Sequence, residues 1–238
     1  MIIVPARLHS SRLKEKLLLE IGGLPIVIRV ANIAKSVDST IVACDSEKIL
    51  NLCKKHKIEA MLTKSSHESG TDRCAEVVKE LKLDSNEVII NLQADEPFIE
   101  PRIIQNLKNK MEENINSTFM ASCYKIINSK EANNPNIVKV VLDKESYALY
   151  FSRSKIPYDA SNINIKYYAH IGIYAFSAKS IMEFCSLNST LEYMEKLEQL
   201  RALYHGKKIL MLKVRSNSIG IDTLEDYNKA LQKYRGNV

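Results

Sequence analysis

Two alternating patterns in the first 115 residues restrict the fold more than any other feature of the sequence. Short apolar runs occupy residues 1–4, 40–44, 58–62 and 88–92. Between them lie stretches of helical periodicity, at residues 25–37, 46–56, 72–81 and 101–111. Buried strands that alternate with helices are typical of β-α-β units. The pattern therefore predicts an α/β fold with a doubly wound, mainly parallel sheet.

The second half of the chain has a different pattern. Strand-like runs at residues 119–126, 137–142, 147–151 and 168–176 follow one another without long helices between them. This spacing indicates a mixed or antiparallel extension of the sheet. A helix over residues 190–205, a strand over 208–214 and a helix over 224–234 are expected to complete the chain. We predict a single α/β domain over residues 1–238, with an inserted, smaller β-rich lobe at about 127–176.

Composition excludes several classes of protein. Apolar residues make up 45% and charged residues 26% of the chain, which is ordinary for a globular domain and not for a disordered one. No apolar run approaches the roughly 18 residues that span a membrane, and the N-terminus is unlike a signal peptide, so we expect a cytoplasmic protein. Five scattered cysteines without a C-x-x-C pair indicate reduced core residues and neither disulfides nor a zinc site.

The net charge of +6 is confined to the second half. Residues 1–120 carry 17 basic and 17 acidic side chains, whereas residues 121–238 carry 17 and 11. A nucleic-acid-binding protein usually gathers such an excess in a basic run, and none is present here. We therefore expect anionic small molecules and not nucleic acid as partners, although a nucleotide-sensing or RNA-binding module without chemistry stays as an alternative.

The segment after the first strand carries three cations, Arg7, Arg12 and Lys16, in a loop of about a dozen residues. Ligands of doubly wound sheets bind beyond the carboxyl ends of the strands, and cations there suit the phosphates of a nucleotide. Neither G-x-G-x-x-G nor a P-loop motif occurs. A basic surface loop without function is the alternative.

Two further segments leave open similar alternatives. The run His67-Glu68-Ser69-Gly70-Thr71-Asp72-Arg73 offers N–H and O–H groups to a ligand, or forms an ordinary helix cap. Asp95 leaves a buried strand beside Glu96 and Pro97, and its carboxylate suits Mg²⁺. Asp222, at another loop-to-helix boundary, is a second candidate ligand or a cap of the last helix.

Taken together, ordered motifs from Ile3 to Asp226 resemble the CMP-KDO synthetases (3-deoxy-manno-octulosonate cytidylyltransferases). They are Pro5-Ala-Arg7 with Ser11-Arg-Leu13, His67-x-Ser-Gly-Thr-x-Arg73, Gln93-x-Asp-Glu-Pro97, Asn134-Pro-Asn136, Val138-Lys-Val-Val-Leu142, Ala148-Leu-Tyr-Phe-Ser-Arg153, His170-x-Gly-Ile-Tyr174, Leu197-Glu-Gln-Leu-Arg201 and Asp222-Thr223. Several motifs in this order are far more specific than any one of them.

The resemblance implies a nucleotidyltransferase-like fold whose smaller lobe also makes a homodimer. It implies transfer of CMP from CTP to the anomeric hydroxyl of 3-deoxy-D-manno-octulosonate (KDO), with release of pyrophosphate, for lipopolysaccharide synthesis. It implies Mg²⁺ as cofactor, held by Asp95 and Asp222, with Arg7, Arg12 and Lys16 as further catalytic residues. The residues it implies for CTP are Ala6, Arg7, Arg12, Lys16, Ser69, Gly70, Thr71 and Arg73, and those for the sugar are Gln93, Arg153, His170, Tyr174, Glu198 and Gln199.

Three points qualify what the resemblance implies. A cytidylyltransferase for another acidic sugar, such as a sialic acid, is the nearest alternative. A lone histidine beside a strand is more often structural than catalytic, so we expect His170 to contact the sugar and not to act as a general base. Lys14-Glu15 stands where such relatives commonly have Pro-Gly, and Ala94 stands where they commonly have Gly. Ala94 is tolerated only if its φ angle is negative.

Overall fold

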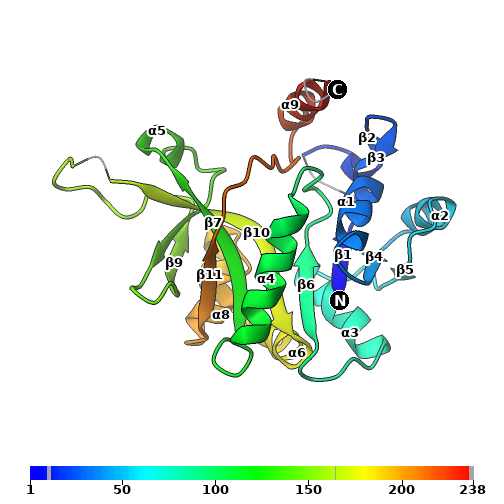
Figure 1. Ribbon diagram of the computed structural model, residues 1–238, viewed down its shortest axis with the longest axis horizontal. Coiled ribbons are helices and arrows are strands. Elements are labelled where there is room, and N and C mark those ends of the chain that lie inside the picture. The colour runs from blue at the N-terminus through cyan, green and yellow to red at the C-terminus, as the bar shows by residue number, and fades with distance from the viewer. Residues whose placement is uncertain (10–11, 164, 236–238) are drawn as a thin grey trace.

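The computed structural model describes residues 1–9, 12–163 and 165–235. Among these residues, nine strands form one sheet in the order β11-β7-β10-β6-β1-β4-β5, and the β8–β9 pair is attached to it through β10 (Figure 1). The strands are β1 (Ile2–Ala6), β4 (Thr40–Cys44), β5 (Ala60–Leu62), β6 (Val88–Leu92), β7 (Met120–Ile127), β8 (Lys139–Leu142), β9 (Ala148–Ser152), β10 (Tyr167–Ser177) and β11 (Ile209–Lys213). A small hairpin is formed separately by β2 (Glu20–Ile21) and β3 (Leu24–Pro25).

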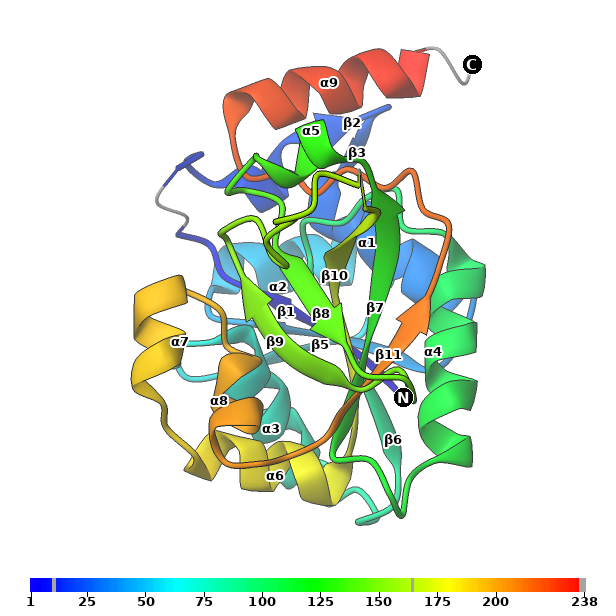
Figure 2. The same cartoon turned by 90° about the vertical axis from the view of Figure 1, so that its left-hand side faces the viewer.

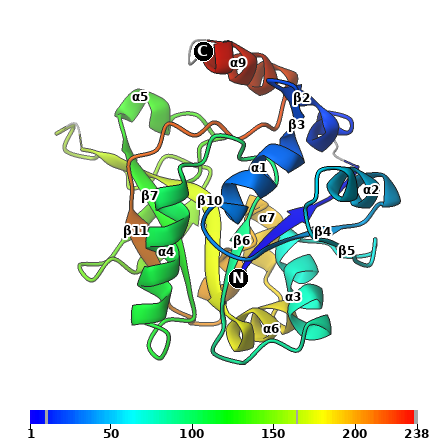
Figure 3. The same ribbon diagram turned by 45° about the vertical axis from the view of Figure 1, so that its right-hand side comes forward.

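The helices connect these strands. They are α1 (Ile26–Lys35), α2 (Glu47–Lys55), α3 (Gly70–Glu80), α4 (Pro101–Glu113), α5 (Ser129–Ala132), α6 (Ala178–Ser186), α7 (Thr190–Glu195), α8 (Leu200–Tyr204) and α9 (Leu224–Arg235), with one 3₁₀ turn, η1 (Lys16–Leu18). Helices α1 and α4 lie on one face of the sheet, and α3 and α6 lie on the other (Figure 3). The predicted doubly wound architecture is thereby confirmed.

The parallel half of the sheet follows the apolar runs of the sequence. Strand β1 is parallel to both β4 and β6, and the observed bounds of β4 and β6 are those predicted. Alternate residues of each strand enter different cores: Ile2 and Val4 pack with α1 and α4, whereas Ile3 packs with α3 and α6. Because both faces are covered, every residue of these three strands is buried.

The antiparallel half confirms the expected mixed extension. Strand β10 is antiparallel to both β6 and β7, and β11 is parallel to β7. The outer ends of β7 and β10 extend past the parallel half, and β8 and β9 lie against them, as Figure 2 shows. The same strand, β10, therefore links the parallel half to the β-rich region of the chain.

The predicted single helix over residues 190–205 is wrong. Helix α7 ends at Glu195 because Lys196 adopts a left-handed conformation (φ 56°), and α8 begins only at Leu200. Apolar residues spaced three apart run through this segment, namely Leu191, Met194, Leu197, Leu200 and Leu203. The break means that they do not form one continuous helical face, and Met194 is 79% exposed and lies outside the core. The helix α6 and the β2–β3 hairpin were not predicted from the sequence. Glu198 and Gln199 lie in the break between α7 and α8.

Two expectations from composition can be compared with the fold. Four cysteines are buried and the fifth is half-buried, and all five are free thiols, as predicted. Within the described ranges, no helix combines the length and the apolar character needed to cross a bilayer.

Candidate active site

Two cavities lie beyond the carboxyl ends of β1 and β6. The first, the β1 cavity, has a volume of about 620 Å³ and is lined by Pro5, Arg7, His9, Arg12, Lys16, Leu17, Glu68, Ser69, Gly70, Arg73, Gln93, Ala94, Asp95 and Asp222. The second, the lobe cavity, has a volume of about 690 Å³ and includes Glu96, Arg153, His170, Tyr174, Glu198 and Gln199. Four residues line both: Arg12, Gln93, Asp95 and Asp222. The two cavities therefore meet at the predicted acidic pair.

The acidic pair is brought together by a shared ammonium group. Lys16 Nζ lies 2.6 Å from Asp95 Oδ2 and 2.9 Å from Asp222 Oδ1, and Arg12 Nη2 lies 2.9 Å from Asp222 Oδ2. Burial raises the pKa of Asp222, but the charges of Lys16 and Arg12 outweigh it and the pKa is lowered. Burial likewise lowers the pKa of Lys16, and the two aspartates reverse this to a raised pKa. The neighbouring cations thus favour the ionised form of Asp222.

The donor set of this pair fits a hard divalent cation. Two carboxylates from segments 127 positions apart converge on one positive group, which the ammonium of Lys16 supplies here. In the part of the chain that the structure describes, no cluster of three or more Asp, Glu, His or Cys side chains could hold a metal. Mg²⁺ commonly uses one or two carboxylates and completes its octahedron with water and phosphate oxygens, so two aspartates suffice.

The segment that carries Asp222 is fastened to the β6–α4 connection. Ser218 Oγ donates to Glu96 Oε2 at 2.6 Å, and the Ile221 N–H donates to the Asp95 carbonyl at 2.9 Å. A Cβ atom at Gly220 would lie 2.9 Å from Glu96 Oε1, so a larger residue there would displace the Glu96 carboxyl group. Burial raises the pKa of Glu96 to about 7. These contacts hold Asp222 beside Asp95.

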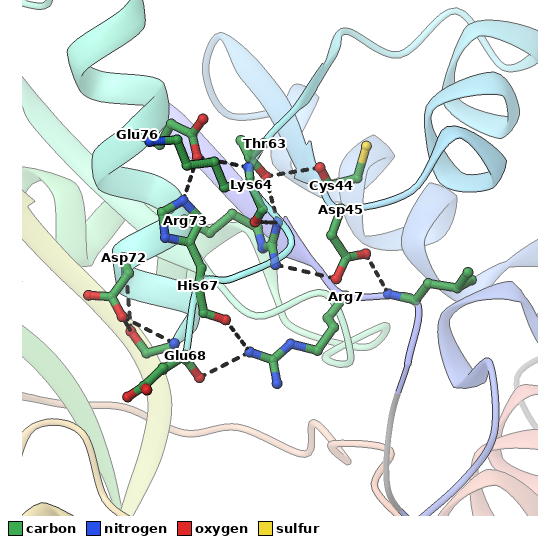
Figure 4. A network of polar contacts seen from close by, with 12 residues as sticks. Arg7, Cys44, Asp45, Thr63, Lys64, His67, Glu68, Asp72, Arg73 and Glu76 are labelled. Carbon is green, nitrogen blue, oxygen red and sulfur yellow. Dashed lines mark hydrogen bonds and ion pairs between the residues drawn. The ribbon is translucent and has the colours of Figure 1, made fainter.

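Arg7 extends from the end of β1 to the segment before α3 (Figure 4). Its Nη2 donates to the carbonyls of His67 and Glu68, at 2.6 and 3.0 Å. The His67 ring in turn pairs with Glu76, which also accepts the N–H of Lys64. The guanidinium of Arg7 thus donates to two neutral carbonyls beside the β1 cavity, and no carboxylate of the described residues forms an ion pair with it.

Arg73 has a different environment, although the resemblance implied a contact with CTP for both arginines. Its side chain is 2% exposed and donates to Thr63 Oγ at 2.6 Å, to the Lys64 carbonyl at 3.2 Å and to Asp45 Oδ2 at 3.3 Å (Figure 4). Burial lowers its pKa, and the Asp45 charge opposes this. Asp45 also accepts the Leu8 N–H at 2.9 Å. The contacts of Arg73 and Asp45 therefore connect α3 with the ends of β4 and β5 and with Leu8, at the start of the loop that follows β1.

Both interpretations of the Ser69-Gly70-Thr71 segment describe part of its structure. Ser69 caps α3 in a capping box with Asp72, and it also lines the β1 cavity with Gly70. A Cβ atom at Gly70 would lie 3.2 Å from Pro5 Cγ, so a larger residue would crowd β1. Thr71 and Ala6 are fully buried and line neither cavity, and Thr71 Oγ1 accepts a hydrogen bond from Asn91 Nδ2.

In the lobe cavity, burial shifts the pKa values of three side chains toward their neutral forms. It lowers the pKa of His170 to about 3, raises that of Glu198 to about 7, and raises that of Tyr174 well above its usual value. Tyr174 donates through its hydroxyl to Gln199 Oε1 at 3.1 Å, and Gln199 Nε2 is buried without a hydrogen-bond partner. An unpartnered amide in a cavity wall is a donor available to a ligand.

The remaining residues expected to contact the sugar also face the lobe cavity. Gln93 donates to Asn91 Oδ1 at 3.0 Å and lies where the two cavities meet. Arg153 is held by carbonyls: Nε donates to Glu195 O at 2.7 Å, and Nη1 to Pro135 O at 3.2 Å. The structure therefore brings all six predicted sugar residues, Gln93, Arg153, His170, Tyr174, Glu198 and Gln199, to one cavity.

Three residues of this region were missed from the sequence. Asp45 follows directly after β4, so the rule that ligand-binding loops lie beyond strand ends could have found it. Lys139 is fully buried, and its Nζ donates to the carbonyls of Asn134, Ile137 and Arg153, at 3.0, 2.5 and 2.5 Å. Ser122 contacts His170 across the sheet. Lys139 lies in the motif Val138-Lys-Val-Val-Leu142, although no role was predicted for it, and no local sequence signal marks Ser122.

A mainly parallel sheet with cations and an acidic pair at its carboxyl edge defines the nucleotidyltransferase class. Residues 1–209 match the family described as cytidylyltransferase. A 3-deoxy-manno-octulosonate cytidylyltransferase of Wolinella succinogenes is 52% identical over 98% of both chains, and one of Helicobacter pylori is 51% identical over 98% of this chain and 96% of that one. The chain belongs to the 3-deoxy-manno-octulosonate cytidylyltransferase family.

A solved structure supports the same assignment. It is described as CMP:2-keto-3-deoxy-manno-octonic acid synthetase complexed with CTP, and it superposes on this chain with a TM-score of 0.93. The two sequences are 35% identical, and the match covers 100% of this chain and 98% of the other. The family that the ordered motifs predicted is thereby confirmed.

Proposed function

We propose that this protein transfers CMP from CTP to the anomeric hydroxyl of KDO. The hydroxyl oxygen forms a bond to the α-phosphorus of CTP, the bond from that phosphorus to the pyrophosphate oxygen breaks, and the hydroxyl proton is released. CMP-KDO and pyrophosphate are the products. One observation carries the proposal: the two cavities meet at Asp95 and Asp222, between the cationic loop and the polar lobe.

The β1 cavity is proposed to hold CTP. Arg7, Arg12 and Lys16 neutralise the triphosphate and the departing pyrophosphate, since phosphoryl transfer depends mainly on positioning and charge compensation. Ser69 and Gly70 approach the nucleotide directly. Arg73 also lines the cavity, but it is held by Asp45, so we expect it to support the wall on which the nucleotide lies. Ala6 and Thr71, which are fully buried, are expected to support the same wall with their side chains.

The acidic pair is proposed to hold Mg²⁺. Bound there, the ion would supply Lewis-acid polarisation of the phosphate oxygens and lower the pKa of a hydroxyl near it. Lys16 pairs with both Asp95 and Asp222, and Arg12 pairs with Asp222. Lys16, which lies between the two carboxylates in the ligand-free protein, is expected to turn from the aspartates to the phosphates when the substrates and the ion are bound.

The lobe cavity is proposed to hold the sugar. Arg153 contributes a positive charge for the sugar carboxylate. Gln93, His170, Tyr174, Glu198 and Gln199 contribute hydrogen-bonding groups, and burial favours the neutral forms of His170 and Glu198, with pKa values of about 3 and about 7. A neutral His170 is not poised to take a proton, which agrees with a role in binding. A sugar with a different arrangement of hydroxyl groups would leave some of these buried polar groups without a hydrogen-bond partner. The cost of these missing hydrogen bonds then discriminates between sugars.

We further propose that residues 1–238 act as one domain whose β-rich lobe, at about 127–176, contributes to a homodimer. Three large apolar side chains of the lobe are exposed and support this: Leu149 (59%), Tyr158 (88%) and Ile163 (72%). Because the reaction consumes CTP and yields an activated KDO, we propose a cytoplasmic location and a role in lipopolysaccharide synthesis.

Pyrophosphate release in the presence of CTP, Mg²⁺ and either KDO or a sialic acid tests the proposed activity. We expect turnover with KDO and little or none with the sialic acid. Faster turnover with the sialic acid would contradict the choice of sugar. Salt-dependent RNA binding without pyrophosphate release would favour the alternative of a module that binds nucleotide or nucleic acid without chemistry.

A further inference from the structure

A buried serine lies behind His170, at an irregular point of the sheet. Ser122, on β7, is 0% exposed. The pairing of β10 with β7 shifts there: Ile171 pairs with Cys123, whereas the next paired residue of β10, Tyr174, pairs with Ser122. Gly172 and Ile173 are the extra residues of this β-bulge. The bulge turns two β10 carbonyls toward the serine hydroxyl.

The hydroxyl of Ser122 has three neighbours for one hydrogen. Its Oγ lies 2.8 Å from the Ile173 carbonyl, 3.3 Å from the Ile171 carbonyl and 2.9 Å from His170 Nε2. Carbonyl oxygens only accept hydrogen bonds, and two oxygens 2.8 Å apart need a hydrogen between them, so the serine donates to the Ile173 carbonyl. Its oxygen can then only accept from the ring, and His170 must carry a hydrogen on Nε2.

The opposite arrangement has a clear cost. If Ser122 donated to Nε2, its oxygen would face two carbonyl oxygens at 2.8 and 3.3 Å with no hydrogen between them. In a buried site such unmatched acceptors cost more than in water, because the medium screens them less and no water replaces the lost bond. The geometry therefore favours one of the two neutral tautomers.

We propose that Ser122 is a positioning residue that holds His170 as the Nε2–H tautomer, so that Nδ1 faces the lobe cavity as a hydrogen-bond acceptor for a sugar hydroxyl. The statement about the sugar rests on the proposed function, whereas the statement about the tautomer rests on the sheet alone. The cavity then presents an acceptor at His170 and a donor at Gln199 Nε2, which is buried and unpartnered.

Aromatic neighbours keep this arrangement rigid. The His170 ring meets Phe151 edge-on, with centroids 5.1 Å apart, and lies 5.5 Å from the ring of Tyr174. Phe151 is fully buried and Tyr174 is 6% exposed. Such walls oppose a charged imidazolium, and burial lowers the pKa of His170 to about 3. The ring thus keeps one hydrogen over the working pH range, and Ser122 determines which nitrogen bears it.

The tautomer can be read by NMR of the full chain labelled with ¹⁵N-histidine, without substrates. The signal of His170 is identified by its loss in His170→Gln. We expect Nε2 to show the shift of a protonated ring nitrogen and Nδ1 that of an unprotonated one, unchanged between pH 5.5 and 8. A hydrogen on Nδ1, or an imidazolium at pH 5.5, overturns the proposal. This measurement needs no change at Ser122, so it stands even if a variant fails to fold.

The role of Ser122 is tested by Ser122→Ala, with Ser122→Thr as the variant that keeps the hydroxyl. We expect Ser122→Ala to give a mixture of tautomers and to raise the KM for KDO about tenfold, with the KM for CTP changed less than about twofold. Ser122→Thr should keep the Nε2–H tautomer. If Ser122→Ala folds and leaves both the tautomer and the KM for KDO unchanged, the serine does not position the ring.

The two levels of the proposal fail separately. If the NMR spectrum shows the Nε2–H tautomer but KDO is not a substrate, the proposed function is wrong and the assignment of Ser122 stands. If KDO is turned over while the hydrogen is on Nδ1, the proposed function stands and this inference is wrong.

Discussion

The two cavities differ in the form of the ionisable side chains that each one favours: the charged form in the β1 cavity and the neutral form in the lobe cavity. In the β1 cavity, pairing between opposite charges raises the pKa of Lys16 and lowers that of Asp222, so that the charged forms are favoured. In the lobe cavity, burial shifts pKa values toward the neutral forms, down to about 3 for His170 and up to about 7 for Glu198. One cavity is suited to compensate the charge of a triphosphate, and the other to select a sugar by hydrogen bonds.

The largest effect is expected where the two cavities meet. Asp95→Ala removes one of the two carboxylates that converge on a cation, and the loss of this charge compensation should lower turnover by at least about 10³-fold. The folded state should persist, since the Asp95 side chain is paired only within the site. Pyrophosphate release measures turnover, and circular dichroism and a thermal melt measure folding.

A matched control for this prediction is Glu113→Gln, which neutralises a carboxylate that is 65% exposed at the end of α4, far from both cavities. It should leave turnover unchanged. Substantial activity in a folded Asp95→Ala protein would contradict the assignment of the acidic pair and would make the contrast between the two cavities irrelevant to catalysis.

Lys16→Met is expected to change two quantities in opposite directions, lowering turnover and raising the affinity for a divalent cation. Turnover should fall about 100-fold, because one of the three phosphate-side cations is lost. Binding of Mg²⁺ or Mn²⁺ to the ligand-free protein should strengthen about tenfold, because the Lys16 ammonium no longer competes for Asp95 and Asp222. Calorimetric titration with Mn²⁺ measures the second effect. Weaker metal binding by the variant would show that the ammonium does not occupy the place of the cation.

Burial of Glu198 in the lobe cavity should make the free energy of unfolding depend on pH. Burial raises the pKa of Glu198 from 4.5 to about 7 in the folded protein. Ionised Glu198 therefore destabilises the fold; this cost is absent below about pH 4.5, grows as the pH rises to 7 and is then constant. Glu198→Gln should stabilise the protein by about 2 kcal/mol at pH 8 and by almost nothing at pH 4.

Urea unfolding at the two pH values measures this difference. The control Glu113→Gln should show no such dependence, because that carboxylate is solvated in both states. An equal effect of Glu198→Gln at both pH values would mean that Glu198 is well solvated, and the contrast between the cavities would then rest on His170 and Tyr174 alone.

What could be predicted from the sequence follows the same division. The parallel half was predictable because strands covered on both faces are continuous apolar runs, and β4 and β6 were placed to the residue. The segment from α7 to α8 was not, because leucines three apart continue through Lys196, whose left-handed backbone ends the helix. That break is what brings Glu198 and Gln199 to the lobe cavity.

The candidate site was predictable to the extent that its residues lie in ordered motifs at strand ends. Asp95, Asp222 and Lys16 were expected together and are in contact. Ser122 could not be found in this way, since its contact with His170 depends on the register of a β-bulge between strands that are 40 residues apart in the chain. Ser11, which is part of the first motif, lies outside the described residues.

The smallest expected effects come from Glu15 and Ala94, two of the three positions that depart from the family pattern, and the backbone angle at each decides the sign of the effect. Glu15 has a φ of 49°, the left-handed conformation that glycine adopts without strain, and Lys16 still reaches both aspartates. Ala94 is not among the residues with positive φ, and it is buried. Glycine should therefore stabilise the fold relative to alanine at position 15 and destabilise it at position 94, by about 1 kcal/mol in each case.

Comparing Glu15→Gly with Glu15→Ala removes the exposed Lys48 ion pair from the difference, and comparing Ala94→Gly with the parent gives the second value. The same sign at both positions in urea unfolding would show that the left-handed backbone at Glu15 is not what supports the cationic loop, and the geometry of Lys16 would need another cause.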